Sequence, residues 1–512
     1  MVSVKGTSNK LFLNVRNFFA ALNLIQAEES GRRRILTASA STESIPRQQW
    51  QPQDHQALEL QHQIVVENNG CEIFPEDEPT PPDSKWVISI KEKLKQADQD
   101  NMACSWTKHS IYRIPHRLKD GEDKAHVPQI VSLGPYHNGK KRLCQMEQHK
   151  WRCLHRILRR EKHKIALYLD SVKEVEEKAR AFYEGTISMS SDEFVEMMVL
   201  DGCFMIELFR GAKVGFEDLG YPFDDPIFST QGSMHSIRRD VIMLENQIPF
   251  FILEQLFCLQ CRQPDQGGLL AELALLFLDP LKPTDSMEVV PLSDQARLHC
   301  LEVFRRSLLG SGPKPEPRVM TPWSEMRQQH IHCVSELRDA GIRFSKRNTD
   351  NFWDIQFNSG TLEIPRLVID DRTRSLFLNL IAFEQCHFNC SDVITSYVIF
   401  MDNLINSSED VGHLQDNGII EHWLGSEAEV AKLFNRLCQE VVFDINDSYL
   451  STLSARVKDY SSHKRHRWGF LLKHKHFGNP WSIISLIAAF VLLVLTFIQT
   501  FYGVYGYYIP GP

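Results

Sequence analysis

Apolar side chains recur along most of this chain at the spacing of an α-helix, which places residues three or four apart on one face. The pattern begins near Lys85 and returns repeatedly through the central region. The segments predicted to be helical share this period. They are residues 143–183, Asp192–Phe209, Arg239–Phe257, Leu269–Leu281, Thr373–Glu384, Thr395–Ile405 and Ala428–Val442.

One region breaks the helical period and alternates apolar and polar residues, as a strand does. The alternation covers Gly341–Phe344 and Trp353–Phe357, and apolar positions resume over Leu362–Ile369 after a Ser359-Gly360 turn. Pro365 lacks an amide hydrogen, which predicts an edge position or a bulge. We therefore expect a mainly α (α+β) fold: a large helical domain with a small antiparallel β hairpin or sheet near residues 341–370, followed by one C-terminal transmembrane helix.

A different pattern closes the sequence, because Ile483–Phe501 is apolar on every side. Thirteen of these positions are Leu, Ile, Val or Phe, and none is acidic or basic. About 20 residues of helix cross a bilayer core, and thirteen such side chains favour insertion by about 4 to 8 kcal/mol. The run predicts a transmembrane helix over residues 480–502, and a buried core helix is the alternative. The residues assigned to the membrane-embedded helix are Ile483, Leu486, Phe490, Leu493, Phe497 and Phe501.

The sequence on either side of the run predicts its orientation. Trp481 and Tyr502 have the amphipathic rings that favour the two interfaces, and Lys or Arg beside a span stays cytoplasmic. We therefore expect a single-pass, tail-anchored protein whose bulk faces the cytoplasm, with a short tail on the far side and the endoplasmic reticulum or plasma membrane favoured. The same basic block can also bind anionic lipid headgroups. The residues assigned to setting the topology are Lys464, Arg465, Arg467, Lys473 and Lys475.

Composition divides the rest of the chain. Residues 1–97 combine arginine-rich and glutamine-rich stretches with an acidic, proline-rich linker, which predicts a disordered extension. An organelle-targeting segment is the alternative, although Glu28 and Glu29 argue against it. The predicted parts that follow are the helical domain (98–455), the basic juxtamembrane segment (456–479), the transmembrane helix (480–502) and a short tail (503–512).

The distribution of charge argues against a nucleic-acid partner. The formal net charge is −8. Between Arg456 and Lys475 seven basic residues stand against Asp459 alone, so this block contributes +6 and the remainder carries −14. A nucleic-acid interface needs a basic surface. The 12 cysteines lack the regular spacing of a disulfide framework, which indicates reduced thiols in a cytosolic compartment.

The sequence contains no pattern that indicates a defined reaction. It has no G-x-S-x-G nucleophile elbow, no phosphate-binding G-x-x-x-x-G-K-[ST] loop and no H-E-x-x-H zinc helix. His330, His332 and Cys333 are weak candidates for metal ligands, because helix-face histidines and a buried cysteine explain them more simply. We predict no catalytic residues and no cofactor.

Two short motifs have a physical interpretation of their own. Gly134-Pro135 is expected to end an extended piece and turn the chain. Pro249 can open a new helix, and Glu245, Asn246 and Gln247 could satisfy the backbone groups freed at the break before it. A polar pocket at these three residues is the alternative.

Longer motifs, in their order along the chain, resemble a known family. They are Ile111–Leu118, Val127–His137, Met146–Trp151, Leu200–Phe204, Arg239–Phe251, Leu337–Phe344, Leu362–Leu367 and Asn379–Glu384. From about residue 105 to residue 502 the chain resembles the plant domain-of-unknown-function 247 family of UPF0481-type proteins. The resemblance implies a plant membrane protein with one C-terminal span and no established enzymatic activity. Some grass relatives are associated with self-incompatibility, but the resemblance transfers no site residues.

Three functions remain open from the sequence. The leading hypothesis is a non-enzymatic, membrane-anchored protein whose helical domain binds other proteins in recognition or signalling. The rival is a membrane-tethered enzyme of unrecognised, metal-dependent type that uses His330, His332 and Cys333. The third is a structural tether that organises membrane contacts. The predicted partners are the lipid bilayer and other proteins.

Overall fold

The computed structural model describes most of the chain from residue 85 onward. The described residues are 85–103, 109–119, 123–261, 268–284, 297–313, 331–388, 390–444, 448–462 and 480–508. The chain divides into two compact units, Met1–Lys95 and Gln96–Pro512. Helix α2 (Lys85–Ala103) contains the described residues of the first unit. The predicted extension up to residue 84 and most of the predicted juxtamembrane segment, over 463–479, lie outside the described residues.

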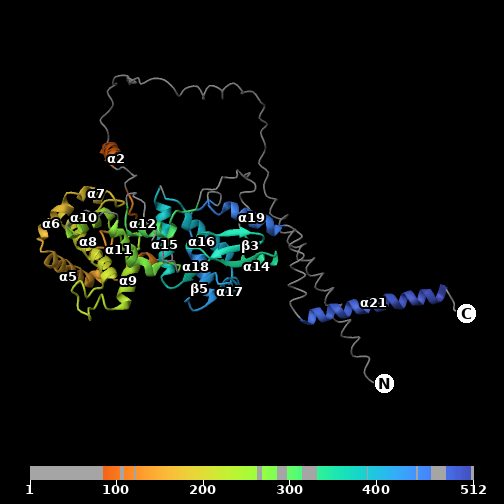
Figure 1. Cartoon of the computed structure of the whole chain (residues 1–512). Helices are drawn as coiled ribbons and strands as arrows, with labels where there is room; N and C mark the ends of the chain where they lie inside the picture. The colour runs from red at the N-terminus through yellow and green to blue at the C-terminus, as the bar shows by residue number, and fades with distance from the viewer. Residues whose placement is uncertain are drawn as a thin grey trace, which may run out of the picture. The chain divides into compact units, whose positions relative to one another are not determined.

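Helix α8 (Ser191–Val214) is central to the N-terminal half of the folded region. It begins with a capping box, in which the Ser190 side chain accepts from the Glu193 amide and the Glu193 carboxylate accepts from the Ser190 amide. Nearly all its residues from Phe194 to Phe209 are buried, because helices pack around it (Figure 1). These neighbours are α5 (Cys144–Glu161), α6 (Ile165–Lys173), α7 (Glu176–Arg180), α10 (Phe250–Cys261) and α11 (Leu269–Leu278).

Two of the predicted helices are broken in the structure. The stretch over 143–183 forms three helices, since α5 ends where Lys162 adopts a left-handed backbone with φ of 55°. The stretch over Arg239–Phe257 becomes the end of α9 (Gln231–Val241) and the start of α10. Residues 242–249 between them are irregular, and Pro249 immediately precedes α10 as predicted. Apolar period alone did not reveal these breaks.

Helix α15 (Thr373–Cys386) is central to the C-terminal half, where it packs on α16, α18 and the short α4 (Asp123–His126). Contacts of α15 with α4, and of α11 with α12, join the two halves. One continuous hydrophobic core extends from Ile111 to Val457. The other helices of this half are α12 (Cys300–Leu309), α14 (Val334–Asp339), α16 (Val393–Leu404), α17 (Ser408–Asp416), α18 (Glu427–Leu437) and α19 (Ser451–Ser462).

The strands form two small sheets. They are β1 (Arg343–Arg347), β2 (Gln356–Asn358), β3 (Thr361–Pro365), β4 (Leu367–Ile369) and β5 (Ile420–His422). The predicted hairpin is confirmed: β2 and β3 are antiparallel around a two-residue turn in which Ser359 and Gly360 both have positive φ. The purely antiparallel sheet is wrong, because β1 pairs with β3 in parallel and β4 pairs in parallel with the remote β5. Alternation assigns faces to residues but does not specify the neighbouring strand or its direction.

The predicted edge position of Pro365 has a counterpart in the pairing. Pro365 ends β3 opposite Arg347 of β1. The pairing with β2 reaches only as far as Glu363, so β3 has no β2 residue beside Pro365. Although β3 is the central strand, β2 does not extend as far as Pro365, so the missing amide hydrogen of the proline breaks no pairing with β2.

Helix α21 (Pro480–Tyr508) is 29 residues long. Of the residues predicted to lie in the membrane, Phe490, Leu493, Phe497 and Phe501 are between 57% and 71% exposed. The side chains of the other two, Ile483 and Leu486, lie outside the described ones. No helix within the described part of the chain is both long enough and apolar enough to cross a membrane. The transmembrane span over residues 480–502 therefore stays a prediction.

Candidate functional site

Side chains, and not a sheet, hold the extended segment that precedes Gly134. The carboxylate of Asp240, at the end of α9, accepts hydrogen bonds from the amides of Gln129, Ile130 and Val131 at 2.7 to 3.0 Å. Burial raises the pKa of Asp240 to about 6, although the three amides act in the opposite direction. The carboxylate is therefore ionised at pH 7, and backbone dipoles offset its charge inside the protein.

A buried ion pair continues this contact. Lys150 of α5 donates to Asp201 of α8 at 2.5 Å, to Glu147 at 2.6 Å and to the carbonyl oxygen of Ser132 at 2.6 Å. Burial acts to lower the pKa of Lys150, but Asp201 and Glu147 outweigh it and raise that pKa overall. The second oxygen of Asp201 accepts from the amide of Gly134 at 2.9 Å. Both members of the pair are thus fully bonded, as a buried charge requires.

Gly134 makes the predicted turn, and the structure explains why a glycine is needed there. Its φ is 72°, and an added Cβ would lie 2.5 Å from the carbonyl oxygen of Gln247. The same carbonyl oxygen accepts a hydrogen bond from the hydroxyl of Tyr183 at 2.9 Å. Any side chain at position 134 would therefore push the segment away from the helices that hold it.

Asn246 and Gln247 bond the backbone, as predicted, and they do so both beside the break, at Asp240, Val241 and Met243, and in distant segments. Asn246 accepts from the amide of Leu133 at 2.8 Å and donates to the carbonyl oxygen of Val131 at 3.1 Å. Gln247 accepts from the amide of Leu301, near the start of α12, at 3.1 Å. The predicted role of these side chains in bonding the backbone is confirmed. Their hydrogen bonds also extend to segments far from the break at Pro249.

Asn379 of α15 completes the arrangement. It accepts from the amide of Leu244 at 3.0 Å and donates to the carbonyl oxygen of Ala125 at 3.0 Å. It therefore ties the irregular segment before α10 to α4 and to the C-terminal half. We call the following buried residues the polar layer: Lys150, Asp201, Asp240, Glu245, Asn246 and Asn379.

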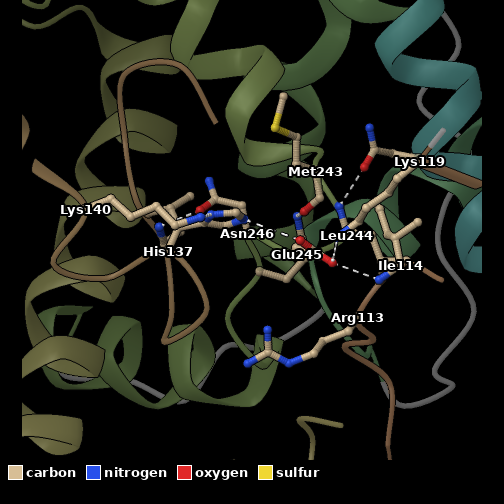
Figure 2. Close-up of polar contacts among 12 residues, drawn as sticks. Arg113, Ile114, Lys119, His137, Lys140, Met243, Leu244, Glu245 and Asn246 are labelled. Carbon is tan, nitrogen blue, oxygen red and sulfur yellow. Dashed lines mark hydrogen bonds and ion pairs between the residues drawn. The ribbon is translucent and has the colours of Figure 1, made fainter. Parts of the chain in front are cut away.

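Glu245 joins this layer to the surface. One of its carboxylate oxygens accepts from the amide of Ile114 at 2.8 Å and from Lys119 at 2.6 Å. Its other oxygen lies 3.7 Å from Nε2 of His137 (Figure 2). Nδ1 of His137 is 2.6 Å from the ammonium of Lys140. Because an ammonium can only donate, Nδ1 accepts and Nε2 carries the ring proton toward Glu245.

The electrostatics of His137 argue for positioning over catalysis. Burial, followed by the charges of Lys140 and Arg142, lowers the pKa of His137 to about 3. The imidazole is therefore neutral at pH 7 and cannot take up a proton there, so it is poorly suited to act as a general base. Its geometry suits a link between the loop that carries Lys140 and the carboxylate of Glu245.

Basic side chains surround this buried pair. Arg113, Lys119, Lys140 and Arg142 all contribute to lowering the pKa of His137, and we call these four the basic rim. Arg113, Lys140 and Arg142 are exposed, whereas Lys119 is partly buried. The guanidinium of Arg113 lies 4.2 Å from the ring centre of Tyr136, a cation–π contact that orients it. The rim can attract an anionic group to the surface.

Two of the three metal candidates from the sequence, His332 and Cys333, lie within the described residues. His332 is exposed, and its Nδ1 lies 2.7 Å from the carboxylate of Glu336. Burial raises the pKa of Cys333, which keeps its thiol protonated and makes it a poor ligand. His330 lies outside the described residues. In the described part of the chain, no group of three His, Cys, Asp or Glu side chains could hold a metal ion.

The predicted topology residues cannot be placed, and the polar layer was missed. Lys464, Arg465, Arg467, Lys473 and Lys475 lie outside the described residues. A signal for the layer was present in Asp201, the one charged residue in the stretch Met197–Ile206 of α8, because a buried charge must have a partner. Its partner Lys150 is 51 positions away, and no local pattern connects the two.

Comparison with known proteins agrees with the motif resemblance. A family model described as a plant protein of unknown function, the domain-of-unknown-function 247 family, matches residues 111–495. The chain belongs to this family. UPF0481 protein At3g47200 of Arabidopsis thaliana is 31% identical over 422 residues, which cover 78% of this chain and 86% of the relative. Putative UPF0481 protein At3g02645 of the same plant is 22% identical over 519 residues, covering 82% and 94%.

No solved structure matches the chain. The region matched by the family model includes the whole polar layer, the basic rim and the first part of α21. Motifs far apart in the sequence meet in the layer: Val127–His137, Met146–Trp151, Leu200–Phe204, Arg239–Phe251 and Asn379–Glu384. Several motifs that are separate in the sequence therefore contribute residues to one set of hydrogen bonds in the folded chain.

Proposed function

We propose that this chain is a membrane-anchored recognition protein that binds other proteins and catalyses no reaction of its own. The observation that carries the proposal is α21, whose described apolar side chains between Ile484 and Tyr502 are exposed. The polar layer supports the non-catalytic half, because its charged groups bind the chain's own backbone. The basic rim supplies a charged surface for a partner.

The exposed apolar side chains of α21 support the proposal that lipid solvates this helix. Four consecutive residues, Leu492 to Leu495, are between 38% and 68% exposed, and four consecutive residues cover a full helical turn. A helix that is apolar all round belongs in a core or in a membrane. The hydroxyls of Thr496 and Thr500 donate to carbonyl oxygens one turn earlier in the same helix. These polar groups are thus satisfied internally, as the interior of a bilayer demands.

The proposed orientation rests on charge. The basic residues between Arg456 and Lys475 precede α21, and such residues stay on the cytoplasmic side of a span. The folded region would then face the cytoplasm, with the residues after α21 on the opposite side of the endoplasmic reticulum or plasma membrane. Protease protection of sealed vesicles, with a tag at each end of the chain, tests this: protection of the N-terminal tag would reverse the orientation.

The membrane proposal is tested by flotation of the full-length chain on vesicles after a carbonate wash. Replacing Leu493 and Phe497 together by Arg should release the chain, because each Arg near the centre of a span costs about 2.5 to 3.5 kcal/mol. Together the two changes remove most of the favourable insertion energy.

The matched control is Leu276→Arg, which places the same residue at a 44% exposed position of α11. This variant should remain on the vesicles. Release of the unmodified chain by carbonate, or retention of the double variant, would contradict the anchor.

The recognition half is tested at the basic rim. Quantitative cross-linking in membranes should show reduced partner capture when Lys140 and Arg142 are both replaced by Glu, because the rim then repels an acidic partner surface. The control replaces the exposed Lys346 and Lys432 by Glu, which makes the same change of net charge elsewhere. Equal loss in both double variants would show that net charge, and not the rim, governs capture.

A further inference from the structure

A cavity of about 290 Å³ lies between α3 (His116–Lys119), α15 and α18. Its floor is apolar and each floor residue is at most 8% exposed. These residues are Leu118, Leu378, Ile381, Ala382 and Leu437. Ligand pockets occupy roughly 300 to 1,000 Å³, so this volume suits a small molecule.

Guanidinium groups border the apolar floor. Arg117 of α3 and Arg436 of α18 line the cavity. Arg374 lies one helical turn before Leu378 on α15. Burial, followed by the charge of the nearby Arg436, lowers the pKa of Arg374. The acidic lining residue is Glu440. Among the residues that line the cavity, two arginines stand against one glutamate, which favours an anionic occupant.

The turn after α18 forms one side of the cavity and is held in place. Arg117 donates to the carbonyl oxygen of Glu440 at 3.1 Å. The side-chain amide nitrogen of Gln385 donates to the backbone carbonyl oxygen of Val442 at 2.9 Å. The side-chain oxygen of Gln385 accepts from the backbone amide of Val442 at 3.1 Å. Glu440 has a φ of 57°, a left-handed backbone that an L-residue keeps only when its surroundings impose it. The cavity wall is therefore fixed before any ligand arrives.

We propose that this cavity binds a small organic anion with an apolar body, of the class of aromatic carboxylates. The carboxylate would meet Arg117 and Arg436, whose planar forks match its two oxygens. The ring would lie on Ile381 and Leu437. The site is distinct from the basic rim and from α21, so it stands or falls independently of the proposed function.

The test is calorimetry on the full-length chain purified in a mild non-ionic detergent, with the same detergent solution as the blank, so that it does not require α21 to insert into a bilayer. The probes are 2-naphthoate and 2-naphthamide, which share the ring system and differ in charge. The chain should bind the carboxylate at least tenfold more tightly than the amide. Equal affinity for the two probes, or no binding of 5 mM 2-naphthoate, overturns the proposal.

Two variants locate the site. Arg436→Gln should weaken 2-naphthoate binding at least tenfold, and Ala382→Leu should abolish it because the larger side chain fills the cavity. Arg343→Gln, at an exposed position of β1, is the matched control and should bind as the unmodified chain does. Unchanged binding in both site variants overturns this location. If Arg436→Gln fails to fold, Ala382→Leu and the comparison of the two probes still decide.

Discussion

The polar layer and α21 place side chains in opposite environments. The layer puts charged and amide groups into the protein interior, where each is at most 6% exposed. Helix α21 does the reverse, since the large apolar side chains described between Ile484 and Tyr502 are exposed. A buried polar group and an exposed apolar side chain are both energetically unfavourable unless a partner is present. In the layer the partners are the chain's own backbone groups and charged side chains, and for α21 we propose lipid.

This contrast separates two classes of substitution. Changes in the layer should lower the free energy of unfolding and leave membrane association of the folded chain intact. Changes in α21 should alter membrane association and leave the stability of the folded region unchanged. A variant that moves both quantities would show that the two regions are coupled.

The largest effect is expected from Asp240→Ala. The change leaves the partly buried amides of Gln129 and Ile130 and the buried amide of Val131 without their acceptor, at up to about 1 to 3 kcal/mol each. The free energy of unfolding should fall by at least about 3 kcal/mol, as measured by urea denaturation in nanodiscs followed by tryptophan fluorescence. Asp218→Ala, at an exposed position, is the control and should change it by less than about 0.5 kcal/mol.

A matched pair of threonines sharpens the comparison at the level of one hydroxyl. Thr395 donates to the buried carboxylate of Glu384 at 2.7 Å, whereas Thr496 donates to the carbonyl oxygen of Leu492 within α21 at 2.7 Å. Thr395→Val should lower the free energy of unfolding by about 1.5 to 3 kcal/mol, because the bond is to a charged group. Thr496→Val should leave this quantity unchanged in the same denaturation assay. Equal losses would remove the distinction between the protein interior, where Thr395 lies, and α21.

The effect that is smallest at neutral pH is a pH dependence at His299, which develops only as the pH falls. This buried residue caps α12 by accepting from the amide of Glu302, and its other nitrogen is 3.0 Å from the carbonyl oxygen of Ser110. Burial lowers the pKa of His299 from 6.5 to about 3. The stability that the neutral ring contributes is therefore present above pH 6.5 and lost as the pH falls toward 3.

His299→Asn tests this dependence, since asparagine can still cap the helix but does not titrate. The stability gap between the unmodified chain and the variant should shrink by about 1.4 kcal/mol per pH unit between pH 6 and pH 4. Urea denaturation at a series of pH values gives the gap directly. A gap that stays constant would mean that the folded protein accepts a proton on His299.

Local patterns in the sequence predicted what local physics decides. The helical period located α8 and α15, and the Ser359-Gly360 turn located the hairpin, because neighbouring residues set both. The break at Lys162 escaped prediction, since a left-handed lysine has no sequence signature comparable to glycine. The parallel pairing of β4 with β5 escaped it as well, because about 50 residues separate the paired positions.

The candidate site was less predictable than the fold. The sequence indicated the turn at Gly134 and a structural role for Glu245, Asn246 and Gln247. It could not indicate that the carbonyl oxygen of Gln247 stands against Gly134, because that contact depends on how α10 packs. The basic rim is likewise assembled by the fold, from the segments that carry Arg113 and Lys140.

The long-range hydrogen bond of Asn379 has a consequence for folding during synthesis on the ribosome. Its bond to Ala125 spans 254 positions. At about 5 to 20 residues per second, a ribosome delivers Asn379 roughly 13 to 50 seconds after Ala125. During that interval the first half of the nascent chain has its helices but lacks the amide that ties them to the second half. Quality control in the cell therefore meets an unfinished intermediate each time this chain is translated.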